Sequence, residues 1–357
     1  MDNLLVGYNH YKRSDLLMLC RKYSKSIDMV YFAWPTMGSG RGCSTTILNR
    51  DDIELTAELL YDLSIISSLG IKLNLLVNSS CFGETSLSSE LVNNIDEILQ
   101  ICNNHDAPIY AVTTVSYVLA QQLKNKHPQL HIKCSINNHS LSSVRQLDIL
   151  KDFYDGFYYN RDYNYDFDTL KEISSWCRSH NKKLYLLVNS GCFTDCPVRQ
   201  LHQNIAAHSA EVSKRQDNFT LNVAICGGYL QDAIHQKDYL SYSNVIRPED
   251  VHIWKPYVDG IKLATRASQN IYKIGESYIL EKYEGDLLNL LEPAHVFSFM
   301  PSIIDNTLIP DDYASKRIAQ KCGHKCKQCG WCVSVCQNAL RKIDEPEWMQ
   351  THENFLI

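Results

Sequence analysis

Five cysteines lie within fifteen residues near the end of the chain, in the segment KCGHKCKQCGWCVSVCQNAL. From Cys326 onward they follow the spacing C-x2-C-x2-C-x3-C. Gaps of two residues allow successive thiolates to point inward from one tight loop, so that four of them surround a single inorganic core. The spacing therefore predicts a metal centre, and it favours a [4Fe–4S] cluster. The predicted ligands are Cys326, Cys329, Cys332 and Cys336.

Two alternatives stay open for this segment. Structural zinc also takes four thiolates from paired cysteines, although the ferredoxin-like rhythm favours iron–sulfur. The fourth ligand is either Cys336 or Cys322, because in two-cluster ferredoxins the last cysteine of such a run serves the other cluster. Gln337 also stands where ferredoxins usually carry proline. We place Cys336 ahead of Cys322.

A second group of cysteines stands upstream, in VNSGCFTDCPVRQLH. Cys192 and Cys196 are four residues apart, and Pro197 then opens a predicted helix. The free N–H groups and the positive end of a helix stabilise a negative sulfur core. Cys226 is the best third ligand, because the two glycines after it permit a close backbone approach. These residues predict a second [4Fe–4S] cluster.

The fourth ligand of this upstream cluster is Cys43 or Cys81, and Cys43 is taken into the predicted set. Each of the two follows a predicted strand, so both would lie at the same end of a barrel. Three further cysteines fall in helical patterns and are expected to be buried small hydrophobic residues: Cys20, Cys102 and Cys177.

Eight short apolar runs alternate with longer amphipathic stretches up to about residue 266. Strands that are apolar throughout are typical of a parallel sheet covered on its outer face. Eight repeats predict a closed α/β fold, a (β/α)8 TIM-like barrel with its chemistry at the C-terminal strand ends. The expected strands are 4–8, 29–33, 72–77, 109–113, 131–136, 156–159, 183–188 and 260–264, and the clearest helices are 52–69, 87–103 and 168–180. An open doubly wound sheet is the alternative, but the glycines of GSGRG do not continue into its nucleotide fingerprint.

The chain is expected to divide into a barrel domain over residues 1–300 and a cysteine-rich, ferredoxin-like iron–sulfur extension over residues 301–357. Residues 197–244 take a longer path than a simple crossover, which predicts a flap over the barrel mouth. The segments LNLLVNSSCFGE and LYLLVNSGCFTD match at eight of twelve positions, so the strands that carry them are expected to end in the same way.

Polar side chains at the predicted C-terminal strand ends are candidates for the substrate site. The candidates for catalysis are His139, Arg161, Arg199 and His202. The candidates for binding are Asn137, Asn189, Lys262 and Arg266. Arginine at such a position suits a carboxylate substrate, because its guanidinium binds both carboxylate oxygens.

Composition narrows the range of functions. The 357 residues carry a formal net charge of −5, which argues against a strongly cationic nucleic-acid surface. The longest apolar runs are strand-sized, and the N-terminal residues lack a secretory pattern, so no membrane span is expected. Fourteen cysteines without an export signal favour metal ligation in a reducing cytoplasm over disulfides.

About the first 270 residues resemble the peptidase U-32 (collagenase-like protease) family. The matching pieces are WPTMGSGRGCSTT, IKCSINNHS, VNSGCFTDCPVRQLH and NVIRPEDVHIWKPYVDGIKLATR. The resemblance implies a TIM-like barrel and, in the branch most similar to this chain, a [4Fe–4S] cluster with oxygen-independent hydroxylation and prephenate as oxygen source. That branch's ligands correspond to Cys43, Cys192 and Cys196, and to Cys226 by role. The cysteine-rich tail is not part of the basic family pattern.

The function that follows is an iron–sulfur enzyme, an oxidoreductase for oxygen-independent modification, above all hydroxylation, of a small molecule, a peptide or an RNA base. RNA is the weakest of the three substrates. A peptidase is the first alternative, although no H-E-x-x-H or G-x-S-x-G pattern is present. A non-catalytic electron-transfer or partner subunit is the other. A redox protein partner and a homo- or hetero-oligomer both remain open.

Overall fold

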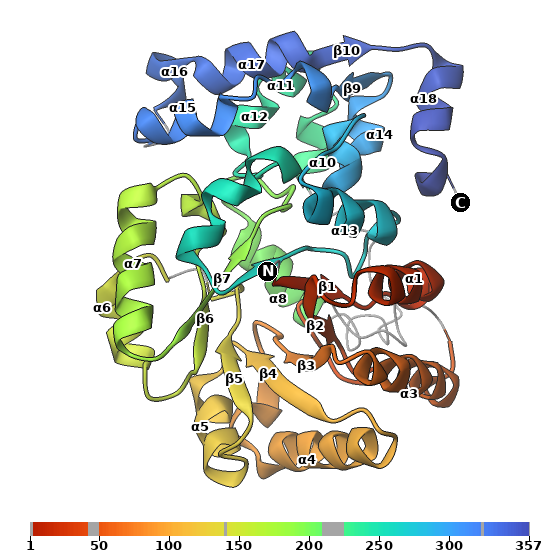
Figure 1. The fold of residues 1–357 in the computed structure, drawn as a ribbon, viewed down its shortest axis with the longest axis vertical. Helices are drawn as coiled ribbons and strands as arrows, with labels where there is room; N and C mark the ends of the chain where they lie inside the picture. The colour runs from red at the N-terminus through yellow and green to blue at the C-terminus, as the bar shows by residue number, and fades with distance from the viewer. Residues whose placement is uncertain (1–2, 42–49, 139–140, 209–224, 323–324, 357) are drawn as a thin grey trace.

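The computed structural model describes residues 3–41, 50–138, 141–208, 225–322 and 325–356. Eight parallel strands close into a barrel in chain order, and β1 pairs with β8 to complete it (Figure 1). The strands are β1 (Leu4–Gly7), β2 (Ile27–Phe32), β3 (Lys72–Val77), β4 (Ile109–Thr114), β5 (His131–Cys134), β6 (Gly156–Tyr158), β7 (Lys183–Leu187) and β8 (Gly260–Lys262). The predicted (β/α)8 barrel is therefore confirmed.

Helices cover the outer face of the barrel. They are α1 (Arg13–Tyr23), α3 (Asp52–Ser68), α4 (Ser89–Asn104), α5 (Tyr117–Lys126), α6 (Val144–Leu150), α7 (Phe167–Ser179) and α13 (Ile271–Leu280), whereas α8 (Arg199–Ala207) lies at the barrel mouth. Helix α4 shows why they form here. The Ser88 hydroxyl caps it by accepting the N–H of Glu90, and one apolar stripe faces the sheet: Leu91, Val92, Ile95, Ile98 and Cys102.

The core has two layers. The large layer between sheet and helices holds Cys20, Cys102 and Cys177, which are buried as expected. The smaller layer fills the barrel interior and is rich in tyrosine and leucine: Leu5, Met29, Tyr31, Leu76, Ala111, Ile136, Tyr158, Tyr185 and Leu187. Two lysines share this interior. Lys133 Nζ lies 3.7 Å from the ring centre of Tyr185, and Lys262 Nζ lies 4.3 Å from that of Tyr31.

The C-terminal part packs beyond one end of the barrel (Figure 1). Its strands β9 (Ser302–Ile304) and β10 (Leu340–Lys342) pair antiparallel. Its helices are α14 (Val296–Phe299), α15 (Tyr313–Ala319), α16 (Cys326–Cys329), α17 (Trp331–Ala339) and α18 (Glu345–Thr351). His352 Nε2 lies 2.8 Å from Asp286 Oδ2, and both side chains are fully buried, so this pair fastens the end of the chain to the rest.

The predicted flap is corrected in part. Helix α8 does line the barrel mouth, but the described remainder of the insertion belongs to the C-terminal part. That remainder is α10 (Ile225–Tyr229), α11 (Ala233–Gln236) and α12 (Tyr239–Tyr242). Helix α12 packs against α17, which lies in the predicted extension. The division at residue 300 stays a prediction. Within the described residues, no helix is long and apolar enough to cross a membrane.

Candidate functional site

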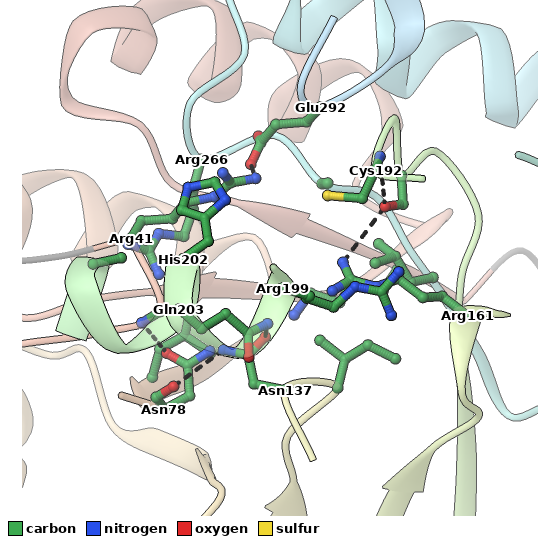
Figure 2. Close-up of a pocket in the computed structure, with 18 of the residues that line it drawn as sticks. Arg41, Asn78, Asn137, Arg161, Cys192, Arg199, His202, Gln203, Arg266 and Glu292 are labelled. Atoms are coloured by element: carbon green, nitrogen blue, oxygen red, sulfur yellow. Dashed lines mark hydrogen bonds and ion pairs between the residues drawn. The ribbon is translucent and has the colours of Figure 1, made fainter. Parts of the chain in front are cut away.

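A pocket of about 330 Å³ opens at the C-terminal end of the barrel. Strand ends form its floor and α8 forms one wall, and Figure 2 shows their side chains converging on it. The volume falls at the small end of the range for ligand pockets, roughly 300–1,000 Å³. The pocket brings together six of the eight predicted catalytic and binding residues: Asn137, Arg161, Arg199, His202, Lys262 and Arg266.

Five cations and one carboxylate line this pocket: Arg41, Arg161, Arg199, Lys262, Arg266 and Glu292. Two of the cations have acid partners. Arg41 forms an ion pair with Glu292, and Arg199 Nη2 donates to Asp162 Oδ1 at 2.8 Å. Asp162 thus compensates the charge of Arg199, which leaves Arg199 to hold the wall of the site.

The other three cations have no ion pair with a carboxylate among the described residues. Arg161 Nη1 reaches only Ser190 Oγ, at 3.5 Å, and its Nε is buried without a partner. Arg266 Nη2 donates to Ser39 Oγ at 2.8 Å. Burial lowers the pKa of both guanidinium groups, and neighbouring arginines lower it further. The pocket therefore carries an excess of positive charge.

Lys262 lies at the base of the pocket and is only 6% exposed. Its Nζ sits over the rings of Tyr31 and Tyr158, at 4.3 and 4.9 Å from their centres. Burial, and next the charge of Arg266, lower the pKa of Lys262 to about 7. Near neutral pH this lysine can therefore gain or lose a proton when the charge around it changes.

Neutral polar groups from α8 and from the loops after β2, β3 and β5 complete the lining of the pocket. Asn137 Nδ2 donates to the Asn78 carbonyl at 3.2 Å, and Gln203 Nε2 donates to Asn137 Oδ1 at 3.3 Å (Figure 2). Gly40 N–H donates to Asn78 Oδ1 at 3.1 Å. Burial and the charge of Arg41 lower the pKa of His202, which favours the neutral form of its ring. His139 lies outside the described residues.

Asn189 does not line the pocket, which corrects its assignment to ligand binding. Its Nδ2 donates to the carbonyls of Ala264 and Leu290, and its Oδ1 accepts the N–H of Ala264 at 2.6 Å. The side chain is fully buried and tied to backbone on both sides. Asn189 is thus a structural residue that fixes the loop after β7.

The same loop depends on Gly191. Its N–H donates to the Glu292 carbonyl at 3.1 Å, and a Cβ there would lie 1.9 Å from the carbonyl oxygen of Pro293. Gly191→Ala is expected to lower the free energy of unfolding by about 3 kcal/mol or more, because backbone must move. Urea unfolding measures this. Gly228→Ala is the control, since nothing lies within 4 Å of its added Cβ. Equal effects of the two would contradict the packing argument.

Three of the four upstream cysteines are described, and among the described residues they do not form a group that could hold a single metal ion. Cys192 lines the pocket. Burial raises the pKa of the Cys226 thiol, and nearby Cys192 and Cys196 raise it further. Cys43 lies outside the described residues. The Cys81 thiol accepts the N–H of Gly83 in its own loop at 3.4 Å, so the choice between Cys43 and Cys81 stays open.

A second cavity, of about 230 Å³, lies in the C-terminal part beside α16 and α17. The thiols that line it are Cys322, Cys326, Cys329 and Cys332. They surround the space without converging on one point, and among the described residues no three His, Cys, Asp or Glu side chains form a site for a single metal ion. Three of the four predicted tail ligands therefore share this cavity with Cys322.

Cys336 does not line this cavity, and the choice between Cys322 and Cys336 as the fourth ligand stays a prediction. It is fully buried on α17, and its thiol donates to the carbonyl of Gln236 at 3.4 Å. The four-residue step from Cys332 carries Cys336 about one helical turn farther along α17, under α12. Cys336 is thus part of the packing between these helices.

Arg41 and Glu292 were missed by sequence reasoning. Arg41 lies in the GSGRG loop, and its glycines drew attention to the loop, but nothing in the motif predicted a charged side chain that lines the pocket. Glu292 lies well after the last barrel strand, and it reaches the pocket because Ser190 and Glu292 form an isolated parallel bridge. No local pattern in the sequence announces that bridge.

No family model matches the chain. Over 326 residues it is 24% identical to a Methanocaldococcus jannaschii protein named as an uncharacterized protease, and the alignment covers 90% of this chain and 91% of that protein. Among solved structures, a U32 peptidase superposes with a TM-score of 0.47 at 13% identity, over 62% of this chain and 82% of that one. An endo-β-1,6-glucanase gives a TM-score of 0.37 at 13% identity, over 60% and 62%. Both TM-scores are below 0.5, so no conclusion is drawn from these superpositions. The sequence similarity to the Methanocaldococcus jannaschii protein, in contrast, extends over nearly the whole chain.

Proposed function

We propose that this protein is an enzyme that binds a small polyanionic substrate, foremost a dicarboxylate, at the barrel mouth and modifies it beside Cys192. The observation that carries the proposal is the charge of the pocket: three of its five basic side chains, Arg161, Lys262 and Arg266, form no ion pair with a carboxylate among the described residues. An anionic substrate would compensate the charges of Arg161, Lys262 and Arg266. A neutral or cationic substrate would leave these charges uncompensated, which costs several kcal/mol per buried ion.

The shape of the charge distribution supports two anionic groups. Arg161 lies near Cys192 on one side of the pocket, while Arg266 lies near Glu292 on the other (Figure 2). Arginine binds carboxylates through two parallel hydrogen bonds, and Lys262 adds a point charge between the two. The prephenate implied by the family resemblance carries two carboxylates and fits this description.

An iron–sulfur cluster at the barrel mouth is part of the proposal. The spacing of Cys192 and Cys196, with Cys226 on the nearby α10, supports this part of the proposal. Such a cluster would supply redox chemistry next to the substrate. Arg161, which lines the same pocket as Cys192 and forms no ion pair among the described residues, would compensate the cluster's negative charge. The reaction class proposed is oxygen-independent modification, with hydroxylation as the specific form and a redox protein as electron donor.

A peptidase is the second candidate, and the name of the Methanocaldococcus jannaschii relative favours it. Cys192 and His202 line the same pocket, as a nucleophile and its base would. No hydrogen bond joins the two side chains in the part of the chain that the structure describes, and the pocket is small for a polypeptide. We therefore place peptide-bond cleavage behind modification of a small anion.

Isothermal titration with succinate, and with succinamide as its neutral analogue, tests the anion site. Arg161→Gln and Arg266→Gln are each expected to weaken succinate binding about 10–100-fold, since a hydrogen bond between charged groups is worth about 1.5–3 kcal/mol. Arg50→Gln is the matched control, because Arg50 pairs with Glu54 and Glu58 outside the pocket. If succinamide binds as tightly as succinate, or if the control loses as much affinity, the barrel mouth is not an anion site.

A further inference from the structure

We infer that the cavity beside α16 and α17 is a [4Fe–4S] site whose four ligands are Cys322, Cys326, Cys329 and Cys332, and that Arg317 is its buried counter-charge. This inference does not depend on the barrel-mouth proposal. It changes the ligand set that the spacing alone favours, because Cys322 replaces Cys336.

The size of the cavity favours a cluster over a single ion. Zinc requires thiolates that converge on one point, with Zn–S bonds of about 2.3 Å. Here the four thiols line a space of about 230 Å³, which is several times the roughly 30 Å³ that one water molecule occupies in the liquid. A cubane of four irons and four sulfides suits four thiolates that stand apart around a common centre.

The buried positive charge of Arg317 at the cavity wall is a second observation, which does not depend on the size of the cavity. Arg317 lines the cavity and is 2% exposed. Its two terminal nitrogens donate to neutral acceptors: the Ser243 carbonyl at 3.0 Å, the Tyr313 hydroxyl at 3.2 Å and Asn244 Oδ1 at 2.6 Å. Its Nε is buried without a partner, and no carboxylate forms an ion pair with it in the described part of the chain.

A buried guanidinium remains charged, and without compensation it costs several kcal/mol. The ring of Tyr165, whose centre lies 3.9 Å from the Arg317 guanidinium carbon, offsets part of that cost, but four neutral thiols would still leave Arg317 without a negative charge beside it. Four thiolates around a [4Fe–4S] core carry a net negative charge, which is the partner that Arg317 lacks. Lys325 also lines the cavity and adds to its positive character, whereas Lys321, which lines it too, is paired with Asp168 at 3.0 Å.

Hydrogen bonds hold the ligands in place. The Tyr313 hydroxyl donates to Cys332 Sγ at 3.6 Å, and Trp331 Nε1 donates to the Tyr313 carbonyl at 3.4 Å. On the barrel side, Cys326 Sγ lies 3.9 Å from the carbonyl oxygen of Ser241, at the end of α12. The next residue, Tyr242, accepts the N–H of Thr194, which stands between Cys192 and Cys196. The two cysteine sites are therefore joined by a short stretch of α12.

The test compares Cys322→Ser with Cys336→Ser in the full chain purified without oxygen. Iron, sulfide and zinc analysis is combined with electron paramagnetic resonance after reduction with dithionite. We expect Cys322→Ser to lose about four irons per chain and the signal of one cluster. Cys336→Ser is expected to keep both, because serine retains the hydrogen bond to Gln236. Cys329→Ser is the second loss variant, since Cys329 is exposed and its replacement spares the core.

The outcomes separate this inference from the barrel cluster. If the wild-type protein holds about four irons and Cys322→Ser holds none, the tail cluster stands and the barrel cluster fails. If Cys336→Ser loses the iron and Cys322→Ser keeps it, the ligand set is wrong. Zinc in place of iron overturns the inference. Arg317→Gln supplies a further readout: removing the positive charge is expected to lower the reduction potential of the tail cluster, and an unchanged potential would exclude Arg317 as its counter-charge.

Discussion

The Lys262→Met variant is expected to be more stable than the wild-type protein at pH 7 and to lose its affinity for anions. Lys262 is 6% exposed and has no acid partner among the described residues. Its pKa of about 7 in the folded protein compares with about 10.4 in an unfolded chain. Three pKa units correspond to about 4 kcal/mol. Cation–π contacts with Tyr31 and Tyr158 offset about 1–2 kcal/mol of that cost, so we expect a net gain of about 2–3 kcal/mol.

The dependence on pH identifies the cause. Below pH 7, Lys262 is protonated in both states, and the folded protein bears the full cost of the buried charge. Between about pH 7 and 10.4 the folded protein has released the proton while the unfolded chain retains it, so the unfolded state binds more protons and stability rises with pH. The variant should lack this rise. Urea unfolding of both proteins, below and within that window, measures it.

As the pH rises, the affinity for anions should change in the direction opposite to the stability. Protonated Lys262 attracts the ligand, so the affinity of the wild-type protein should fall as the pH rises through about 7. In Lys262→Met this pH dependence should disappear together with most of the affinity. Proton uptake on binding, measured by titration calorimetry in buffers of different ionisation enthalpy, is the direct readout.

Lys133→Met provides the matched control. Lys133 faces the same barrel interior, is fully buried, and has a pKa that burial lowers well below its ordinary value. It does not line the pocket. Lys133→Met should therefore stabilise the protein as well but leave anion binding largely intact. If both variants lose binding equally, Lys262 has no direct contact with the anion, and the lysines act on the pocket only through the fold.

The barrel was predictable from the sequence because its signal is local and repeated. Each strand is an apolar run, and the predicted range for the third strand, 72–77, coincides with β3. The apolar runs do not show, however, which residues of a strand face the inside of the barrel. The segment IKC in β5 looks uniformly buried, but alternation places Lys133 inside the barrel and Cys134 in the outer layer, against helices. A spacing pattern does not say which face of a strand points inward.

Sequence spacing also does not show which cysteine completes the C-terminal group, for the same reason. The spacing from Cys326 onward correctly placed three thiols in one cavity, since short gaps keep neighbours together. Whether Cys322 or Cys336 joins them depends on the direction of α17 and on what covers it. Helix α12 covers it, and α12 comes from a segment almost one hundred residues earlier. Contacts over such separations leave no mark on local spacing.

Single serine variants of Cys192 and Cys196 are expected to distinguish the two candidate functions of the barrel mouth, which are an iron–sulfur enzyme and a peptidase. As cluster ligands, Cys192 and Cys196 are equivalent, and either serine variant should lose the same share of iron, about four per chain. As a peptidase nucleophile, Cys192 would act alone, because it lines the pocket and Cys196 does not. Cys192→Ser would then reduce cleavage by orders of magnitude while Cys196→Ser retained it.

We expect the first pattern, for a reason of charge. Arg41, Arg161 and Arg199 all act on Cys192, and Arg199 also acts on Cys196. Arg41 and Arg199 are already paired with Glu292 and Asp162, but Arg161 forms no ion pair among the described residues, and a negatively charged cluster beside it would supply the missing charge. Iron analysis and a peptide-cleavage assay on the same two preparations decide between the two. Iron content unchanged in both variants, with cleavage lost only in Cys192→Ser, would establish the peptidase and remove the barrel cluster.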